Sequence, residues 1–485
     1  EGEALEKLII KNVRHLMIKI SEMSPTIFVM EDLQWADASS IELLDALYKL
    51  VEKHRLIFIN VFRPSYLEDW HEKIASIGDR LPVHHVQIEL APLDRINSIA
   101  LINNILNIEG LPSSVKDTIM DRSDGNPFFI EELVRYLIDE RAVVVTRNGF
   151  QVTDRINSAV IPDTIHDVLM SRIDRLEERT KQLVKIASVI GRCFFDCIIK
   201  DVADSIDDVD SRLEYVKKIQ LIRDHRHTDE LKYVFKHALA QEAAYASTLL
   251  QQRKALHLKV GQSIERIFQG RLTEFYGMLA FHYSKGEDLD KAETYMTKAG
   301  EEALKASASS EALYYYKDVI KLYTERYGES IDPDKMTDLE SNLAFAFYYR
   351  GNKEEAIKYF NSSLYRLGIK EKNTNITILS EIIVNLLIIV LFLYLPLPKG
   401  KNVPTYRENR IINIILAKGH LLALTDAKRM FANTLMGFKE CFKFDLSKSQ
   451  SPLNGVFWRS CPLFFHRNFI FDWKKIIGIR TKLLI

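Results

Sequence analysis

The chain has 485 residues, of which 47% are hydrophobic, 27% charged and 10% aromatic, with 19 glycines and 13 prolines. This composition excludes disordered, collagen-like and low-complexity proteins and predicts a folded chain of about three domains. The 66 basic and 66 acidic side chains cancel, so no global positive field attracts nucleic acid or anionic lipid. Four cysteines beside an ample core favour a reducing compartment, and no secretory leader pattern opens the sequence at Glu1. We therefore expect a cytoplasmic protein, and a fragment of a longer one.

Residues 1–95 predict an α/β region. Residues 26–30 form a short apolar run that ends in two acids, and residues 56–61 form a second run that ends at an arginine and a proline. A helical pattern lies between them, which predicts buried parallel strands, a right-handed crossover and a sheet covered on both faces. Residues 83–90 predict a third strand.

The remaining chain predicts mostly helix. Residues 96–160 predict a helical lid, and residues 161–250 a compact winged-helix-like arm with a small hairpin. Residues 255–445 carry apolar and small residues at the offsets of tetratricopeptide (TPR) repeats, although the array is irregular. Residues 446–485 predict an irregular tail in which basic and aromatic side chains are interleaved.

Residues 376–395 form a strongly apolar stretch that contains Glu381 and Asn385 and is followed by Pro396. A membrane span needs about 20 predominantly apolar residues. The two polar residues and the proline favour a helix buried in the helical array, with a membrane span as the less favoured alternative.

Glu31 and Asp32 are the strongest candidates for chemistry. Acids at the carboxyl end of a parallel strand lie where open α/β sheets bind ligands. A phosphoryl-transfer site needs one carboxylate for magnesium and another group that orients the attacking water, and these two acids can divide the roles. The alternative is structural, because a strand can simply end in polar residues before a helix whose N-terminus favours negative charge.

The segment 26–37, Thr-Ile-Phe-Val-Met-Glu-Asp-Leu-Gln-Trp-Ala-Asp, resembles the Walker B motif of STAND proteins, the signal-transduction ATPases with numerous domains. Three more segments follow in the family's order: 58–64 resembles the sensor 1 strand, 123–133 the Gly-x-Pro motif, and 161–245 the helical and winged-helix region. The resemblance covers about residues 1–365. It implies an α/β fold class, a partial P-loop NTPase parallel sheet, followed by a mostly α region with a winged-helix-like domain and a TPR-like α-solenoid.

The resemblance also implies roles. Glu31 would hold Mg²⁺, Asp32 would orient water, and Arg63 would sense the terminal phosphate of ATP. Arg63 has a structural alternative as a solvated strand end, because the residue before a proline is extended in any case.

Gly125, Asn126 and Pro127 would lie near the base and ribose, with an ordinary turn as the alternative. The sequence contains no Gly-x-x-x-x-Gly-Lys-Ser/Thr string. Backbone N–H groups and the lysine of that string cradle phosphates. We therefore expect the cradle ahead of Glu1, and ATP or ADP with Mg²⁺ to require it.

The function implied by the resemblance is an ATP/ADP-dependent switch for an attached effector, with a nucleotide cyclase as the expected effector and an ATP-hydrolysing parent protein. The fragment alone is expected to be inactive. A non-enzymatic TPR adaptor with a structural ATPase remnant and a transcriptional regulator are the alternatives. Residues 201–250 hold ten acids and seven bases, which is not the basic footprint of DNA binding. Expected partners are the effector, a peptide or protein on the solenoid and further copies in the active state, rather than nucleic acid or membrane.

Overall fold

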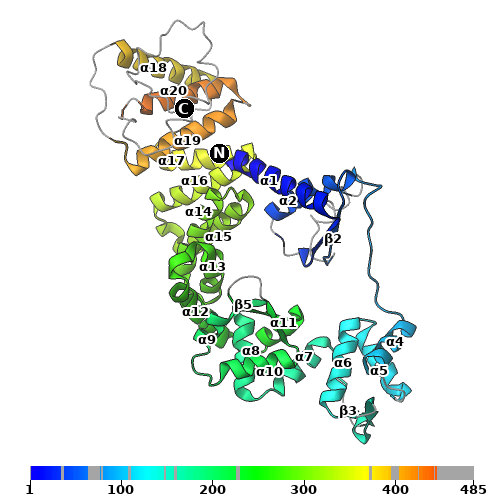
Figure 1. Cartoon of the computed structure of the whole chain (residues 1–485). Helices are drawn as coiled ribbons and strands as arrows, with labels where there is room; N and C mark the ends of the chain where they lie inside the picture. The colour runs from blue at the N-terminus through cyan, green and yellow to red at the C-terminus, as the bar shows by residue number, and fades with distance from the viewer. Residues whose placement is uncertain are drawn as a thin grey trace. The chain divides into compact units, whose positions relative to one another are not determined.

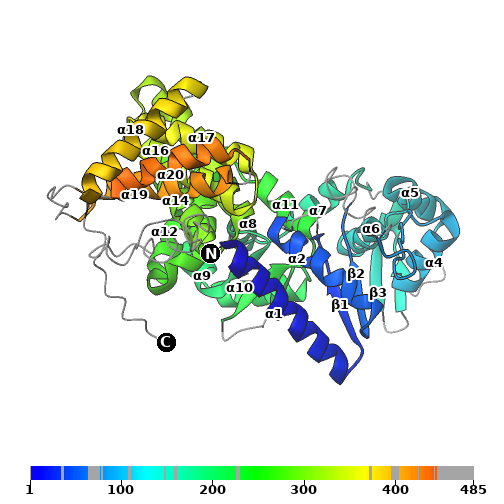
Figure 2. The same ribbon diagram turned by 90° about the horizontal axis from the view of Figure 1, so that it is seen from above.

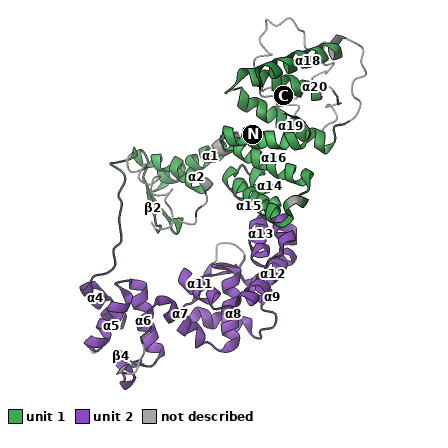
Figure 3. Cartoon of the chain, turned by 180° about the vertical axis from the view of Figure 1, so that it is seen from behind, with its two compact units in different colours: residues 1–84, 296–485 green, residues 85–295 purple. Residues whose placement is uncertain are grey.

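The computed structural model describes residues 2–33, 36, 38–63, 77, 80–106, 111–146, 149–157, 161–225, 230–370, 374–394, 403–423, 425–441 and 443–444. In this part of the chain the fold is mostly helical, with three small sheets and a solenoid-like series of helices (Figures 1 and 2). The chain divides into two compact units: residues 1–84 with 296–485, and residues 85–295 (Figure 3). The predicted tail at 446–485 lies outside the described residues.

The α/β element at the start of the chain contains a two-stranded parallel sheet. Its strands are β1 (Thr26–Met30) and β2 (Leu56–Asn60), paired so that Thr26 is opposite Leu56 and Met30 opposite Asn60. A parallel pair needs a crossover connection. Here α2 and a short 3₁₀ turn supply it, and α1 precedes β1: α1 (Gly2–Met23), α2 (Ala38–Tyr48), η2 (Lys49–Glu52).

Only one face of this sheet is covered within the described residues. Phe28 and Phe58 stack with ring centroids 5.6 Å apart and, with Leu56, join the apolar cluster formed by α1, α2 and η2. Successive strand side chains point to opposite faces, and the other face is 43% to 58% exposed at Ile27, Val29, Ile57 and Ile59. The prediction of parallel strands is therefore confirmed, whereas the predicted cover on the second face is absent from the described chain.

Residues 83–90 do not form the predicted third strand and belong to no sheet. Val86, Ile88 and Leu90 alternate as a strand requires, but they are 78% to 89% exposed. Alternating apolar and polar residues allow a segment to form a strand. The strand forms only where a neighbouring strand hydrogen-bonds with its backbone N–H and C=O groups.

The second unit begins with a small helical domain whose apolar cluster contains Ile102, Ile130 and Leu133, all fully buried. Its helices are followed by a β-hairpin: α4 (Arg95–Leu106), α5 (Ser113–Ser123), α6 (Pro127–Asp139), β3 (Val143–Thr146), β4 (Gly149–Val152), η4 (Asp154–Asn157).

A winged-helix-like arm follows in the same unit. Its three antiparallel strands lie in the order β5-β7-β6, and β6 with β7 confirms the hairpin predicted from the sequence. Its elements are α7 (Ile165–Asp174), α8 (Glu178–Ile190), β5 (Cys193–Phe195), α9 (Asp196–Val202), α10 (Val209–Lys218), β6 (Ile222–His225), β7 (Lys232–Phe235), α11 (Ala238–Ala246).

The rest of the described chain consists of helices and short 3₁₀ turns, as predicted. These elements are α12 (Leu250–Ile267), η5 (Gln269–Phe275), α13 (Tyr276–Lys285), α14 (Leu289–Lys305), α15 (Ser309–Tyr327), η6 (Gly328–Ser330), α16 (Pro333–Tyr349), α17 (Lys353–Arg366), α18 (Asn375–Tyr394), α19 (Tyr406–Leu422), α20 (Ala427–Cys441). Small residues let neighbouring helices approach closely. A Cβ added at Gly261 would lie 2.8 Å from the Tyr283 ring, and one added at Gly300 would lie 2.9 Å from the Tyr316 ring.

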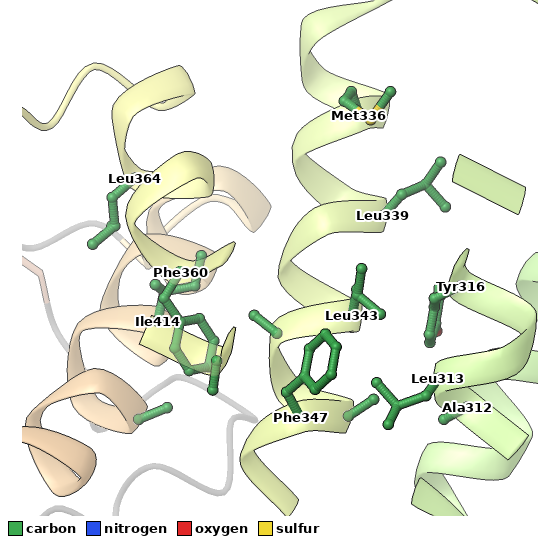
Figure 4. Packing of buried hydrophobic residues seen from close by; sticks show 14 of the residues in the cluster. Ala312, Leu313, Tyr316, Met336, Leu339, Leu343, Phe347, Phe360, Leu364 and Ile414 are labelled. Carbon is green, nitrogen blue, oxygen red and sulfur yellow. The ribbon is translucent and has the colours of Figure 1, made fainter. Parts of the chain in front are cut away.

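The core of the later helices is continuous from α15 to α19. Tyr316 of α15 faces Leu343 of α16, and Phe360 and Leu364 of α17 lie beside Ile414 of α19 (Figure 4). All five side chains are at most 3% exposed. Full burial of such side chains stabilises each by roughly 1.5–3 kcal/mol, and this core adds to the side-chain N-caps of α16, α17 and α19 in stabilising the helices.

Helix α18 carries the apolar stretch noted in the sequence, and only one of its sides is buried. Ile378 and Asn385 are 4% and 3% exposed, whereas eight apolar side chains on the helix are 39% to 82% exposed: Ile376, Leu379, Ile383, Val384, Leu386, Leu387, Val390, Leu391. The prediction that this helix is buried is therefore correct for only one of its sides. Among the described residues, no helix meets the length and apolarity that crossing a membrane requires.

A buried chain of hydrogen bonds ties the arm to the first pair of repeat helices. Tyr245 Oη lies 3.0 Å from His257 Nε2, and His257 Nδ1 lies 2.9 Å from His282 Nδ1. His282 also bonds the backbone of Ile190, whose carbonyl can only accept. It follows that His282 donates from Nε2, His257 donates from Nδ1 and Tyr245 donates its hydroxyl, so that both imidazoles are neutral. Burial lowers the pKa of His257 to about 4 and that of His282 to about 3.

Candidate functional site

The first candidate region is the carboxyl edge of the β1–β2 sheet. The parallel pairing continues past the strand ends, because Val61 N donates to Met30 O at 2.8 Å and Leu33 N donates to Val61 O at 3.2 Å. Glu31 and Asp32 therefore pass directly beside the end of β2. The structure brings the two predicted acids to one edge of the sheet, where parallel-sheet proteins bind ligands.

Asp32 has a left-handed backbone, with φ of 57°. This conformation costs a residue with a Cβ about 1–2 kcal/mol, least for Asn and Asp, and such strain is typical of functional sites. The turn redirects the chain out of β1, and buried Leu33 anchors it at 6% exposure. Glu31 and Arg63 are exposed and Asp32 is half-buried, so all three can meet a ligand.

Sequence reasoning missed Asn60, the last residue of β2 at this edge. Its Oδ1 accepts a hydrogen bond from Tyr48 Oη at 3.2 Å, and burial raises the pKa of Tyr48 to about 12. Tyr48 is therefore a neutral donor that fixes the amide. A single polar residue within the apolar run Leu-Ile-Phe-Ile-Asn was the available signal.

The second candidate region is the turn between α5 and α6. Asn126 caps α6, because its Oδ1 accepts from Phe128 N at 3.0 Å and from Phe129 N at 3.2 Å. Pro127 occupies the first turn of α6, where its missing N–H costs nothing. Gly125 has a left-handed φ of 70°. Each residue of the predicted motif therefore has a structural role, whatever ligand it meets.

Gly125 is required by close approach as well as by φ. Its carbonyl accepts from Leu93 N at 2.8 Å. A Cβ at this position would overlap Leu93 O and lie 2.9 Å from Leu93 N, and backbone cannot move aside as a flexible side chain can.

We expect Gly125→Ala to destabilise the second unit by about 2–3 kcal/mol, from steric overlap and the left-handed backbone together. Urea unfolding followed by circular dichroism measures this loss. Gly270→Ala is the matched control, because a Cβ there meets nothing within 4 Å. Equal stability of the Gly125 variant and wild type would contradict the packing described here.

A buried ion pair links α6 to the arm, and the sequence gave no sign of it. Glu132, 3% exposed, binds the guanidinium of Arg172 on α7. Arg172 Nη2 also donates to the Ile219 carbonyl at 2.9 Å, at the end of α10. Near the start of α6, the Phe128 ring lies 3.9 Å from the imidazole of His237, whose pKa burial lowers to about 4. The helix that begins at the Gly-Asn-Pro turn thus contacts the arm near its start, at Phe128, and in its middle, at Glu132.

The two candidate regions belong to different units and are described separately: Glu31, Asp32 and Arg63 lie in the first unit, and the Gly125–Pro127 turn lies in the second. Trp35, Asp37 and Pro64, which complete the sequence motifs, lie outside the described residues. Mg²⁺ is commonly bound through one or two carboxylates together with water and substrate phosphates. A single exposed Glu31 carboxylate fits that mode only with a nucleotide present. Within the described ranges, no three His, Cys, Asp or Glu side chains gather as a metal site.

Comparisons with known proteins find a family model, a relative and a solved structure that are similar to this chain. A family model of a domain of unknown function, DUF8739, matches residues 95–148, a range that includes the Gly-Asn-Pro turn. An uncharacterised protein of Rhizobium meliloti (strain 1021) is 22% identical over 317 residues, and the match spans 62% of this chain but 28% of that protein's length. Among solved structures, the STAND protein with a tetratricopeptide repeat sensor from Pyrococcus horikoshii aligns over 91% of this chain and 74% of its own, at 13% identity and a TM-score of 0.33.

Proposed function

We propose that the chain is part of a nucleotide-dependent signalling switch of the STAND type. The observation that carries the proposal is the carboxyl edge of the β1–β2 sheet, where Glu31, a strained Asp32 and Arg63 lie on adjacent strand ends. Acids and a cation at that edge suit a magnesium-bound polyphosphate.

In this proposal Glu31 binds Mg²⁺, Asp32 orients the attacking water and Arg63 contacts the terminal phosphate. The Gly125–Pro127 turn packs near the nucleoside. The chain has no Gly-x-x-x-x-Gly-Lys-Ser/Thr string, so the proposal requires that a phosphate cradle be supplied outside these 485 residues. Exchange of ADP for ATP would release the arm and activate an effector, for which a nucleotide cyclase is the proposed class.

A scaffold is the second candidate, supported by the helix pairs from α12 onward. Stacked pairs of this kind expose surfaces that bind peptides or neighbouring domains. In a scaffold the sheet edge would have only a structural role, and substitution of a residue at that edge would not change the binding of any ligand.

Nucleotide binding and hydrolysis by the natural protein that carries this chain separate the two candidates. We expect Asp32→Asn to lower ATP hydrolysis about 100-fold or more with nucleotide affinity nearly unchanged, because the water loses its orienting carboxylate. Arg63→Ala should reduce the preference for ATP over ADP, because only ATP has the phosphate that Arg63 contacts.

Lys53→Ala is the matched control, since Lys53 is an exposed cation in the same element, before rather than after β2. Wild-type protein that binds neither nucleotide, or an Asp32→Asn variant that hydrolyses ATP at the wild-type rate, would refute the switch and leave the scaffold.

A further inference from the structure

Helix α18 presents an apolar stripe that takes no part in the proposed nucleotide site. The helix packs against α20, where Lys428 Nζ donates to Asn375 Oδ1 at 2.9 Å (Figure 1). Its side with Ile378 and Asn385 is buried, whereas the opposite side holds eight aliphatic side chains that are 39% to 82% exposed. A contiguous apolar surface of this size marks an interaction site.

Five of the eight side chains follow a heptad repeat. The repeat consists of Ile376, Leu379, Ile383, Leu386 and Val390, which are three and four residues apart and therefore occupy positions a, d, a, d and a. A β-branched residue fills every a position, and leucine fills both d positions. This arrangement favours a parallel two-stranded coiled coil. We call these five side chains the seam, and the other three exposed side chains flank it.

The size of the stripe suits a second copy of the chain. Eight aliphatic side chains that are about half exposed leave on the order of 500 Å² of apolar surface, so that two copies together bury about 1,000 Å², the lower limit for a specific interface. An isolated coiled coil of little more than two heptads is marginal, because helix formation itself is costly. Helix α18 is already folded against α20, so association has only to bury the stripe.

The charge pattern of α18 favours a second copy over a membrane surface. The 20 residues of the helix contain a single charged side chain, Glu381, which lies outside the seam and is partly buried. The e and g positions beside the seam carry no charge, so two copies do not repel each other. Amphipathic helices that lie on membranes carry Lys and Arg on their polar face, and α18 contains neither.

We propose that two copies of this chain associate through α18, in a parallel contact where each seam residue meets the same residue of the other copy. Such a contact is symmetric and closed, so it produces a dimer rather than a fibre. The seam is complete within α18, and the contact therefore requires no nucleotide.

Sedimentation equilibrium of the full chain without nucleotide tests the dimer. We expect a dissociation constant below about 10 μM. Ile383→Glu should weaken the dimer about 100-fold or more, because two carboxylates would face each other in an apolar seam. Leu250→Glu is the matched control, since it changes an exposed leucine of α12, and it should leave the dimer unchanged. Both substituted positions are exposed, and circular dichroism checks that both variants fold. Wild type that stays monomeric up to about 100 μM, or an Ile383→Glu variant that dimerises as tightly as wild type, overturns the proposal.

Oxidative cross-linking tests the parallel orientation. Ile376→Cys should form an inter-chain disulfide in higher yield than wild type, whose four natural cysteines give the background. In an antiparallel contact centred on Ile383, the two copies of residue 376 would lie about 20 Å apart, too far for a disulfide. A dimer that cross-links through Ile383→Cys but not through Ile376→Cys would therefore refute the parallel contact.

Two further results would assign the stripe to another occupant and overturn the proposal. One is a monomer that binds vesicles of phosphatidylcholine and phosphatidylserine and loses this binding on Ile383→Glu. The other is a monomer that dimerises only after residues 446–485 are removed, which would assign the stripe to that tail.

Discussion

Glu132→Ala is expected to destabilise the second unit by about 3–5 kcal/mol, the largest effect of any single substitution considered. The carboxylate is 3% exposed and is the ion-pair partner of Arg172, whose side chain is 10% exposed. Breaking a buried pair leaves a charge in low dielectric that is compensated only in part, because the other carboxylate near Arg172, that of Asp139, lies 4.0 Å from its Nε and is 45% exposed. The bond from Arg172 to the Ile219 carbonyl cannot replace the lost carboxylate. Urea unfolding measured by circular dichroism gives the free-energy change.

The matched control is Asp117→Ala, which breaks the ion pair of Asp117 with Arg95 in the same unit. That pair joins atoms 2.5 Å apart, but its side chains are 45% and 65% exposed, so its loss should cost less than about 1 kcal/mol. The double variant Glu132→Leu/Arg172→Leu should recover most of the stability, because apolar replacement of both partners leaves no buried charge. A Glu132→Ala variant as stable as the control variant would show that the pair contributes nothing to the arm.

The parallel strands could be predicted because their signals are local. Residues 26–30 and 56–60 are apolar runs followed by polar residues, and the intervening helical pattern allows only a crossover connection. The same reasoning placed Glu31, Asp32 and Arg63 at one edge of the sheet, because parallel strands end on the same side. The chemical roles of these residues remain predictions, since no ligand tests them.

The third strand could not be judged from its own residues. Val86, Ile88 and Leu90 have the correct alternation, yet they are exposed and belong to no sheet. Whether an alternating segment pairs depends on a neighbouring strand, which is information from elsewhere in the chain. The exposed apolar faces of β1, β2 and α18 could not be predicted for the same reason. Hydropathy predicts that an apolar face will be buried, but it does not identify the element that covers that face.

Residue types alone offered an ordinary turn at Gly-Asn-Pro as the alternative to a nucleotide-binding motif, whereas the connections of this turn needed coordinates. Asn126 as cap and Gly125 with a left-handed backbone follow from residue chemistry. The pairing of Glu132 with Arg172 spans 40 residues, and no spacing rule links them. Because α6 carries both the turn and this ion pair, any shift of the turn must be transmitted to the arm or break the pair.

The stability of the second unit is expected to fall as pH decreases from 7 to 5, by about 3–4 kcal/mol from His257 and His282 alone. Burial lowers their pKa values to about 4 and about 3, from about 6.5 in the unfolded chain. Below pH 6.5 the two histidines therefore bind protons in the unfolded state but stay neutral in the folded state. The stability that they contribute above pH 6.5 is lost as the pH falls toward 4. The nearby cations Lys285 and Arg253 lower the pKa of His257 further. Unfolding in urea at both pH values should show this loss in wild type and in the control His166→Leu, which removes an exposed histidine.

The double variant His257→Leu/His282→Leu should be less stable than wild type at pH 7 but should lose most of the pH dependence. A double variant with the wild-type pH dependence would contradict the neutral hydrogen-bond chain.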